Sequence, residues 1–202
     1  MISKPKTEGW LGKYSYNQFH NYQIKEYQAA MEYVKKFNTA LDLGGNLGIM
    51  SSRMVKDFKT VHAFEPLFYD HLKNNVPTDN ITVYPYAVGA QHSFETMRVG
   101  LHHSGGSNII DHIAIGDGFK RVEVVTVDSF KFEDVDFIKI DVEDFEWFAL
   151  QGARHTIERY KPTLLIELKD DNSHHREIIS FLETFGYIRN IVGEMDSVFY
   201  VE

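Results

Sequence analysis

The feature that most constrains this chain is residues 39–51, where a short apolar run passes directly into a glycine-rich turn. Residues 40–43 have the composition of a buried strand, and Gly44, Gly45 and Gly48 follow it. Glycine leaves room for a ligand beside the backbone, and a helix that begins near Gly48 would direct its free N–H groups toward that ligand. Because a tight turn by itself needs only one glycine, the spacing predicts a ligand-binding turn at residues 42–48.

A second signal follows one helix later, at the end of the next predicted strand. Residues 60–66 are rich in residues that favour strands, and Glu65 and Pro66 end the segment. In a parallel sheet Glu65 would lie at the carboxyl edge beside the glycine turn, where a carboxylate accepts the hydroxyls of a ribose. The alternative interpretation is that Glu65 is a solvated acid at a strand end. The preceding glycine turn favours the interpretation that Glu65 binds a ribose.

Strand-like and helix-like segments alternate along most of the chain. The predicted strands are residues 39–43, 60–66, 81–86, 135–140 and 163–167. The predicted helices are residues 48–58, 67–75, 145–159 and 173–184. This alternation indicates an α/β fold with right-handed crossovers, in which a mostly parallel twisted sheet carries helices on both faces. Residues 186–192 and 197–201 predict a C-terminal antiparallel hairpin, and Pro85 indicates an edge position for the third strand.

The remaining segments fit around this core. Residues 93–99 and 122–127 predict two additional strands, joined by a long loop. We expect a single domain over residues 1–202, in which residues 1–37 form an N-terminal helical arm or cap and residues 38–202 form the core.

Composition excludes several classes of partner. With 29 acidic and 21 basic residues the chain has a net charge of -8, which repels nucleic-acid backbones unless the basic residues cluster, and the sequence shows no cluster. The lack of cysteine excludes disulfides and thiolate zinc sites. No apolar run approaches the length of a membrane span. We therefore expect a cytoplasmic protein with neither a nucleic-acid nor a membrane partner, and the sequence carries no indication of oligomeric state.

Together these segments resemble the FkbM family of S-adenosylmethionine-dependent methyltransferases, whose fold is Rossmann-like. The resemblance covers about residues 40–170, and its motifs lie at residues 42–48, 63–66, 87–89, 124–128, 138–143 and 152–153. Family members usually carry glycine after the Asp-Val-Glu element, whereas Asp144 stands here. This departure places a negative charge at a helix start, where the helix dipole favours it.

The resemblance implies S-adenosyl-L-methionine as cofactor and gives each matching residue a role. The turn at residues 42–48 would hold the methionine end, Glu65 would hold the ribose, and the residues around Pro66 and Ala87 would flank the adenine. The expected cofactor-binding residues are Asp42, Gly44, Gly45, Asn46, Gly48, Glu65, Pro66, Leu67, Ala87, Val88 and Asp141.

Asp141 and Glu143 leave a predicted strand at the switch point of the sheet and are the expected catalytic residues. Either is suited to act as the general base or to orient the acceptor, since two nearby carboxylates raise one another's pKa. The alternative is that Asp141 only holds the cofactor amino group and that Glu143 is a solvated acid at a helix start.

The resemblance also implies O-methylation, and we expect a small-molecule or glycan acceptor with a hydroxyl group, such as a sugar. The turn-rich residues 102–108 predict a lid over that acceptor. The expected acceptor residues are His102, His103, Ser107, Asn108 and Glu167. No metal-ligand spacing is recognisable, so no metal is expected, although the loop histidines with Glu143 or Glu167 offer donors.

Two other functions share part of this pattern. A nicotinamide-dependent oxidoreductase also has a glycine turn and an acid after the second strand, but here the spacing departs from G-x-G-x-x-G and Asp42 precedes the turn. A cofactor-binding module without catalysis is the third interpretation, and Asp144 is its only support.

Overall fold

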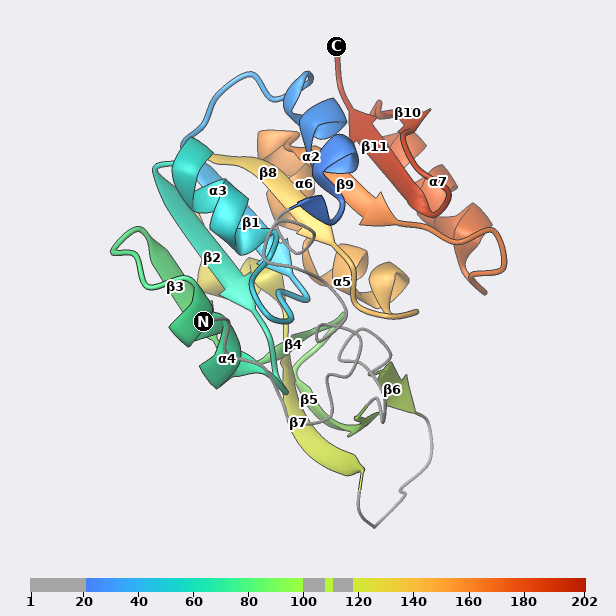
Figure 1. Ribbon diagram of the computed structural model, residues 1–202. Helices are drawn as coiled ribbons and strands as arrows, with labels where there is room; N and C mark the ends of the chain where they lie inside the picture. The colour runs from blue at the N-terminus through green and yellow to red at the C-terminus, as the bar shows by residue number, and fades with distance from the viewer. Residues whose placement is uncertain (1–20, 100–107, 111–117) are drawn as a thin grey trace.

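The computed structural model describes residues 21–99, 108–110 and 118–202, and within them it contains two sheets (Figure 1). The larger sheet has the strand order β10-β11-β9-β8-β1-β2-β3. Its strands are β1 (Thr39–Leu43), β2 (Thr60–Phe64), β3 (Ile81–Tyr84), β8 (Val135–Ile140), β9 (Thr163–Glu167), β10 (Ile188–Ile191) and β11 (Asp196–Tyr200). The helices around it are α2 (Ile24–Met31), α3 (Ser51–Asp57), α4 (Tyr69–Asn75), α5 (Glu146–Gly152), α6 (Arg154–Tyr160) and α7 (His175–Thr184).

Strand pairing confirms the predicted parallel sheet and its closing hairpin. The pairs from β3 through β2, β1 and β8 to β9 are parallel, whereas β11 is antiparallel to both β9 and β10. Along the chain, β1 to β3 extend the sheet in one direction and β8 to β11 extend it in the other. The strand order therefore reverses between β1 and β8, and the crevice outside the carboxyl ends at such a reversal is where ligands bind in Rossmann-like folds. β3 lies at the edge that Pro85 indicates.

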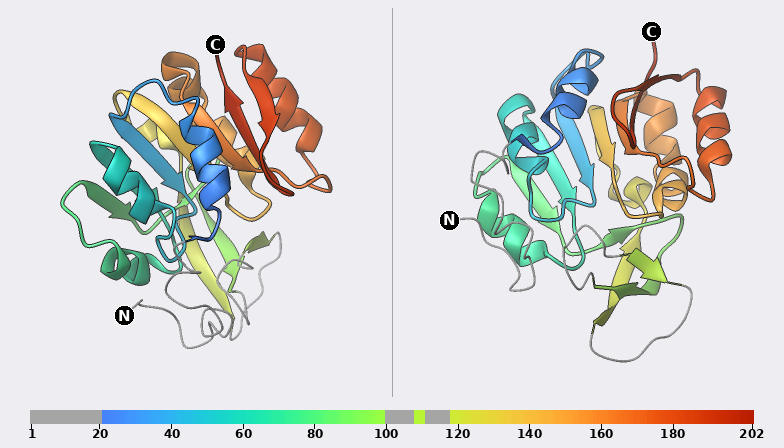
Figure 2. Two further views of the ribbon diagram at one scale, coloured as in Figure 1. Left: turned by 45° about the horizontal axis from the view of Figure 1, so that its top comes forward. Right: turned by 45° about the vertical axis from the view of Figure 1, so that its right-hand side comes forward.

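Neighbouring residues of each central strand face two different helical layers. Leu41 and Ile138 belong to the hydrophobic cluster that α5, α6 and α7 complete. Ala40 and Phe137 belong to the cluster that α2 and α3 complete. Figure 2 shows the helices on both sides of the sheet. Because side chains alternate along a strand, residues 42 and 139 face the layer formed by α2 and α3.

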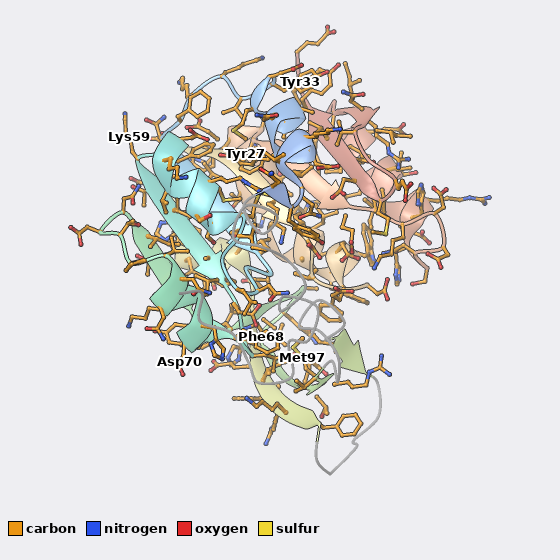
Figure 3. The ribbon with its side chains drawn as sticks, in the orientation of Figure 1. Tyr27, Tyr33, Lys59, Phe68, Asp70 and Met97 are labelled. Atoms are coloured by element: carbon orange, nitrogen blue, oxygen red, sulfur yellow. The ribbon has the colours of Figure 1, made fainter. Side chains whose placement is uncertain are left out.

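A smaller sheet lies beyond the carboxyl ends of the main sheet, below it in Figure 1. Its order is β4-β7-β5-β6, and its strands are β4 (Ala87–Val88), β5 (Ser93–Arg98), β6 (Asn108–Ile110) and β7 (Phe119–Val125). The antiparallel pair β5 and β7 confirms the two additional strands expected from the sequence. Figure 3 labels Met97 of this sheet and Phe68, which precedes α4, and both side chains line the cavity described below.

Two helices begin later than the sequence pattern predicts. α3 begins at Ser51 because the glycine turn continues to Gly48, whose φ is 87°. α4 begins at Tyr69 because the preceding Phe68, with φ of -113° and ψ of 21°, is not helical, and the N–H groups of Leu67 and Phe68 donate to the Glu65 carboxylate. No helix among the described residues is long and apolar enough to cross a membrane.

The predicted helix at residues 145–159 consists of α5 and α6, which meet at Ala153. Gly152, the last residue of α5, lies directly against the segment that follows β4. A Cβ added to Gly152 would lie 2.0 Å from the carbonyl oxygen of Gly89. This close approach positions α5 and the loop at residues 141–145 that leads into it.

Replacing Gly152 by alanine should destabilise the fold more than replacing Gly186 by alanine. Overpacking against the Gly89 backbone should cost about 3 kcal/mol. At Gly186, where φ is 84°, a Cβ meets no atom within 4 Å. Only the left-handed backbone penalises alanine there, by about 1 kcal/mol. Urea unfolding of the two variants measures the difference, and equal losses would contradict the packing role of Gly152.

Candidate active site

A cavity of about 570 Å³ opens at the carboxyl ends of the central strands, where the strand order reverses. The smaller sheet contributes Met97 and Ile109 to its wall. The predicted cofactor residues that line this cavity are Gly44, Gly45, Asn46, Glu65, Pro66, Leu67, Ala87, Val88 and Asp141. Glu143 and Glu167 line it as well, so the structure brings the predicted cofactor turn and the predicted catalytic acids into one space.

Two predicted cofactor residues, Asp42 and Gly48, are not part of the cavity wall. Asp42 is fully buried beneath the turn, where the Ser51 hydroxyl donates to its carboxylate. A Cβ added to Gly48 would lie 2.8 Å from Val76, so this glycine is required by packing against α4 and its end. Both residues support the turn from behind.

Of the predicted acceptor residues, the structure places Glu167 in the cavity and describes only the backbone of Asn108, at the start of β6. His102, His103 and Ser107 lie outside the described residues. The lid at residues 102–108 therefore stays a prediction.

The glycine turn is held by backbone hydrogen bonds and close packing. The N–H groups of Gly44 and Gly45 both donate to the Phe64 carbonyl oxygen at 3.0 Å, which ties the turn to the end of β2. Gly44 has a φ of 82°, and a Cβ there would lie 1.9 Å from the Asp141 carbonyl oxygen. At Gly45 a Cβ would lie 2.4 Å from Leu72. Sequence analysis attributed the glycines to ligand approach, and the structure adds a packing reason for each of them.

The Glu65 carboxylate accepts backbone N–H groups from both sides of the turn. Oε2 accepts from Asn46 at 2.9 Å, and Oε1 accepts from Leu67 at 2.8 Å and Phe68 at 2.9 Å. Burial raises the pKa of Glu65, and these hydrogen bonds oppose that rise. Since a carboxylate offers about four acceptor positions, one position on Oε2 stays open. The buried Oδ1 of Asn46 has no hydrogen-bond partner among the described residues.

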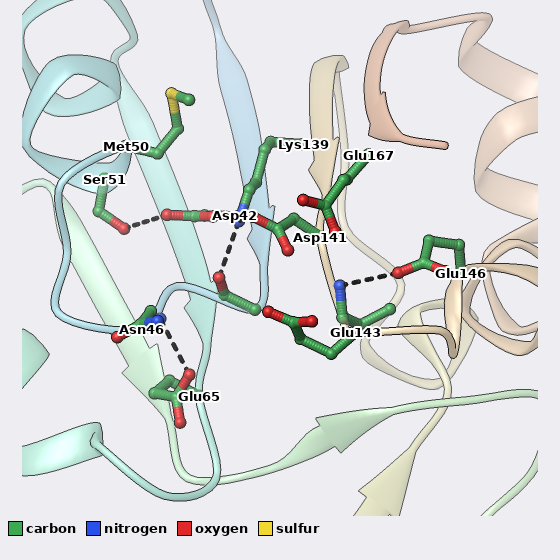
Figure 4. A network of polar contacts seen from close by, with 12 residues as sticks. Asp42, Asn46, Met50, Ser51, Glu65, Lys139, Asp141, Glu143, Glu146 and Glu167 are labelled. Carbon is green, nitrogen blue, oxygen red and sulfur yellow. Dashed lines mark hydrogen bonds and ion pairs between the residues drawn. The ribbon is translucent and has the colours of Figure 1, made fainter. Parts of the chain in front are cut away.

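Lys139 is buried beneath the same turn, next to the last residue of β8. Its Nζ donates to the Gly44 carbonyl oxygen at 2.8 Å and lies 3.5 Å from Asp42 Oδ1 and 3.4 Å from Asp141 Oδ2 (Figure 4). The register of β1 and β8 pairs Asp42 with Lys139 directly. Burial alone would lower the pKa of Lys139, but the Asp141 and Asp42 carboxylates outweigh burial and raise it.

Asp141, Glu143 and Glu167 form a carboxylate cluster at the ends of β8 and β9, with one oxygen of each within 4.8 Å of the others. Lys169 Nζ lies 3.1 Å from Glu167 Oε2 and 3.6 Å from Glu143 Oε2. Burial, followed by the neighbouring carboxylates, raises the pKa of Glu143 to about 8 and also raises that of Glu167. Such oxygens suit either proton transfer or a divalent cation, and the lysines neutralise part of their charge.

The loop that carries these acids has left-handed backbone at two consecutive residues, Glu143 with a φ of 54° and Asp144 with a φ of 69°. Glycine is favoured in this region and aspartate tolerates it, which explains how Asp144 replaces the usual glycine. Glu146 holds the loop, because its carboxylate accepts from Val142 N at 3.2 Å and from Asn172 Nδ2 at 2.9 Å. Burial raises the pKa of Glu146 to about 7.

Comparison with known families agrees with this geometry. The Methyltransferase FkbM domain matches residues 42–189, from the acid that precedes the turn into β10. The chain belongs to the FkbM methyltransferase family. This membership confirms the resemblance drawn from the motifs. Among curated proteins, none matches the chain.

Solved structures show the same fold. A methyltransferase FkbM from Methylobacillus flagellatus KT is 20% identical to this chain, with a TM-score of 0.52. The match covers 82% of this chain and 44% of that protein, so this chain spans less than half of that relative. A precorrin-6y C5,15-methyltransferase from Geobacter metallireducens GS-15 is 9% identical with a TM-score of 0.51 over 87% of both chains. A SAM-dependent methyltransferase from Aquifex aeolicus is 14% identical with a TM-score of 0.52 over 98% of both chains. At these identities the likeness shows a methyltransferase fold.

The cavity of this FkbM domain also contains residues that the sequence analysis did not select, above all Lys139, Lys169 and Tyr22. A lysine among the apolar residues 137–140 of a central strand is a signal for Lys139, because a buried ammonium requires partners. Tyr22 precedes α2, and its carbonyl oxygen accepts from the Arg53 guanidinium. Burial, with a smaller effect of Asp141, raises the pKa of Tyr22 to about 12. No local pattern marks Tyr22, since only the packing of α2 brings it to the cavity.

The free energy of unfolding of the FkbM domain should fall as pH rises, and Glu143→Gln should make this fall smaller. The pKa of Glu143 rises from 4.5 to about 8 on folding, so the fold favours the protonated carboxyl. Its stabilising effect is complete below about pH 4.5 and is lost as pH rises through about 8. Urea unfolding at about pH 5 and at about pH 9, close to the two ends of that range, should show a smaller decrease for the variant than for the parent protein. Glu158→Gln on the exposed side of α6 is the control, and an equal decrease in both variants would contradict the assignment.

Proposed function

We propose that this chain is an S-adenosylmethionine-dependent methyltransferase that methylates a hydroxyl of a sugar or another small polyol-like metabolite. In this proposal residues 1–202 form one methyltransferase domain, with residues 1–37 as an N-terminal arm. The observation that carries the proposal is that a single cavity contains the glycine turn, Glu65 and the carboxylates that follow β8 and β9.

The residues of the cavity fit S-adenosyl-L-methionine. The open acceptor position on Glu65 Oε2 suits a ribose hydroxyl, and the unpartnered Oδ1 of Asn46 offers a second acceptor. Leu67, Ala87 and Val88 add an apolar wall suited to adenine. The carboxylate cluster adds negative charge to the same cavity, which favours a cofactor that carries a sulfonium and an ammonium. When bound, this cofactor supplies an activated methyl group.

On the acceptor side, Asp141, Glu143 and Glu167 would orient a hydroxyl and receive its proton. Carboxylate oxygens accept hydrogen bonds from neighbouring hydroxyls, so the cluster suits a polyol. With a pKa of about 8, Glu143 exchanges a proton near neutral pH, where a general base is most effective. Lys169, 3.6 Å from Glu143 Oε2, stabilises the ionised form. Correct alignment of the hydroxyl supplies much of the remaining rate enhancement.

A small hydroxylated acceptor is also favoured by charge. The net charge of -8 opposes binding to a nucleic-acid backbone. The cavity concentrates three further acids at its acceptor end, which would repel phosphate groups there. Neutral hydroxyl groups can instead donate to these acids.

Glu65→Gln should weaken binding of S-adenosylhomocysteine by about 1.5–3 kcal/mol, because it removes a charged hydrogen-bond acceptor. Glutamine keeps one oxygen for the N–H groups of Leu67 and Phe68 but leaves the N–H of Asn46 without its acceptor, so the melting temperature is measured beside the affinity to check that the turn persists. Calorimetric titration measures the affinity of both proteins. NAD is the control ligand: binding of NAD without S-adenosylhomocysteine would favour the oxidoreductase, and unchanged affinity of the variant would exclude Glu65 from the site.

Asp141→Asn or Glu143→Gln should lower turnover about a hundredfold or more if the residue is the general base. The variant that lacks the general base should bind S-adenosylhomocysteine almost as tightly as the parent protein, since the base acts on the acceptor. Single-turnover assays and calorimetry separate the two effects. If both variants transfer methyl groups at the parent rate, neither carboxylate is the base.

Labelled cofactor, incubated with separate pools of glycans, small metabolites, proteins and nucleic acids, tests the acceptor class. We expect the label to enter the glycan or small-metabolite pool. Label that enters only proteins or nucleic acids would overturn the assignment. Binding of the cofactor without transfer to any pool would favour a module without catalysis.

A further inference from the structure

The ammonium group of Lys139 touches both halves of the cavity at once. We propose that Lys139 is a positioning residue that couples the cofactor turn to the acceptor-side acids, holding the Gly44 carbonyl and the Asp141 carboxylate in one fixed arrangement. This inference rests on the proposed function and goes beyond it, because it assigns a role to a residue that need not touch the acceptor.

Geometry supports a coupling role. An ammonium has three N–H donors, and Lys139 has three acceptors around it: Gly44 O at 2.8 Å, Asp141 Oδ2 at 3.4 Å and Asp42 Oδ1 at 3.5 Å. Gly44 and Asp141 come from different strands and line the same cavity. Figure 4 shows Lys139 between Asp42 and Asp141, with Glu143 and Glu167 on the side of Asp141. A shift of the turn would therefore act on Asp141 through Lys139.

The ammonium of Lys139 carries one positive charge, whereas the two carboxylates that it contacts carry two negative charges. Asp42 Oδ2 is bonded to the Ser51 hydroxyl, whereas Oδ1 has no hydrogen-bond partner among the described residues and faces only the Lys139 ammonium. The same ammonium is shared with Asp141. Two carboxylates and one ammonium leave one excess negative charge, and Asp141 directs it into the cavity, where a cationic cofactor would balance it.

Lys169, the other lysine in the cavity wall, does not contact both the glycine turn and the acids. Its side chain is 28% exposed, against 6% for Lys139, so solvent screens its contacts with Glu143 and Glu167. No described contact joins Lys169 to the glycine turn. Of the two lysines in the wall, Lys139 alone is placed to connect the turn with the acids.

The test separates positioning from stability by comparing Lys139→Met/Asp42→Asn with Asp42→Asn. Lys139→Met alone leaves Asp42 buried without a counter-charge, so its melting temperature should fall strongly. Adding Asp42→Asn removes that charge and should restore most of the melting temperature. Affinity for S-adenosylhomocysteine should nevertheless stay on the order of tenfold weaker than in Asp42→Asn, since Gly44 and Asp141 still lack their partner. Methyl transfer at saturating cofactor should fall as well, because Asp141 loses the cation that orients its carboxylate.

Lys161→Met is the matched control, because Lys161 Nζ also donates to a backbone carbonyl, that of Phe185, but lies away from the cavity. It should lower the melting temperature without changing affinity. If the double variant binds S-adenosylhomocysteine as tightly as Asp42→Asn and transfers methyl groups as fast, Lys139 serves stability alone and the inference is wrong. If the parent protein binds no S-adenosylhomocysteine, the proposed function itself fails. Should Lys139→Met not fold, the comparison of the double variant with Asp42→Asn remains decisive.

Discussion

The contact of Lys139 with Asp42 joins the two central strands, where the Asp42 side chain is fully buried and that of Lys139 is only 6% exposed. A charge transferred from water into such a place is costly unless a partner and hydrogen bonds compensate for it. The pair therefore requires β1 and β8 to be neighbours in one register, which is the arrangement that creates the reversal of strand order. The glycine turn and Asp141 both contact the same ammonium, so the cavity depends on this interaction.

The acids of the cavity occupy two environments that suit two tasks. Glu65 is held by backbone N–H groups on both oxygens, which fixes its orientation and suits it to binding. Burial first, and then the neighbouring Asp141 and Glu167 carboxylates, raises the pKa of Glu143 to about 8, and the partly exposed Lys169 opposes that rise. Burial raises the pKa of both groups, so the difference between them is in their partners, which are backbone N–H groups at Glu65 and charged side chains at Glu143. This separation is what a cofactor pocket joined to an acceptor pocket requires.

Local patterns predicted much of the framework, because strands and turns depend on short-range chemistry. The strand at residues 163–167 has the predicted bounds, and β10 and β11 form the expected antiparallel hairpin on either side of Gly193. The glycine turn and Glu65 are also adjacent, since the carboxyl ends of parallel strands meet at one edge. The predicted helix at residues 145–159 is divided into α5 and α6, and a contact distant in sequence lies at that break, where Gly89 packs against Gly152 at the end of α5.

The sequence by itself determined the parallel α/β fold, the family and the edge of the sheet where the site lies, because each follows from periodicity and from motifs within a few residues. The tertiary structure alone decided that Asp42 supports the turn from behind, that Lys139 joins it to Asp141, and that Tyr22 reaches the cavity. These placements depend on strand register and helix packing across segments far apart in the chain. Burial and electrostatic neighbours set the pKa values, and both exist only once those segments are assembled.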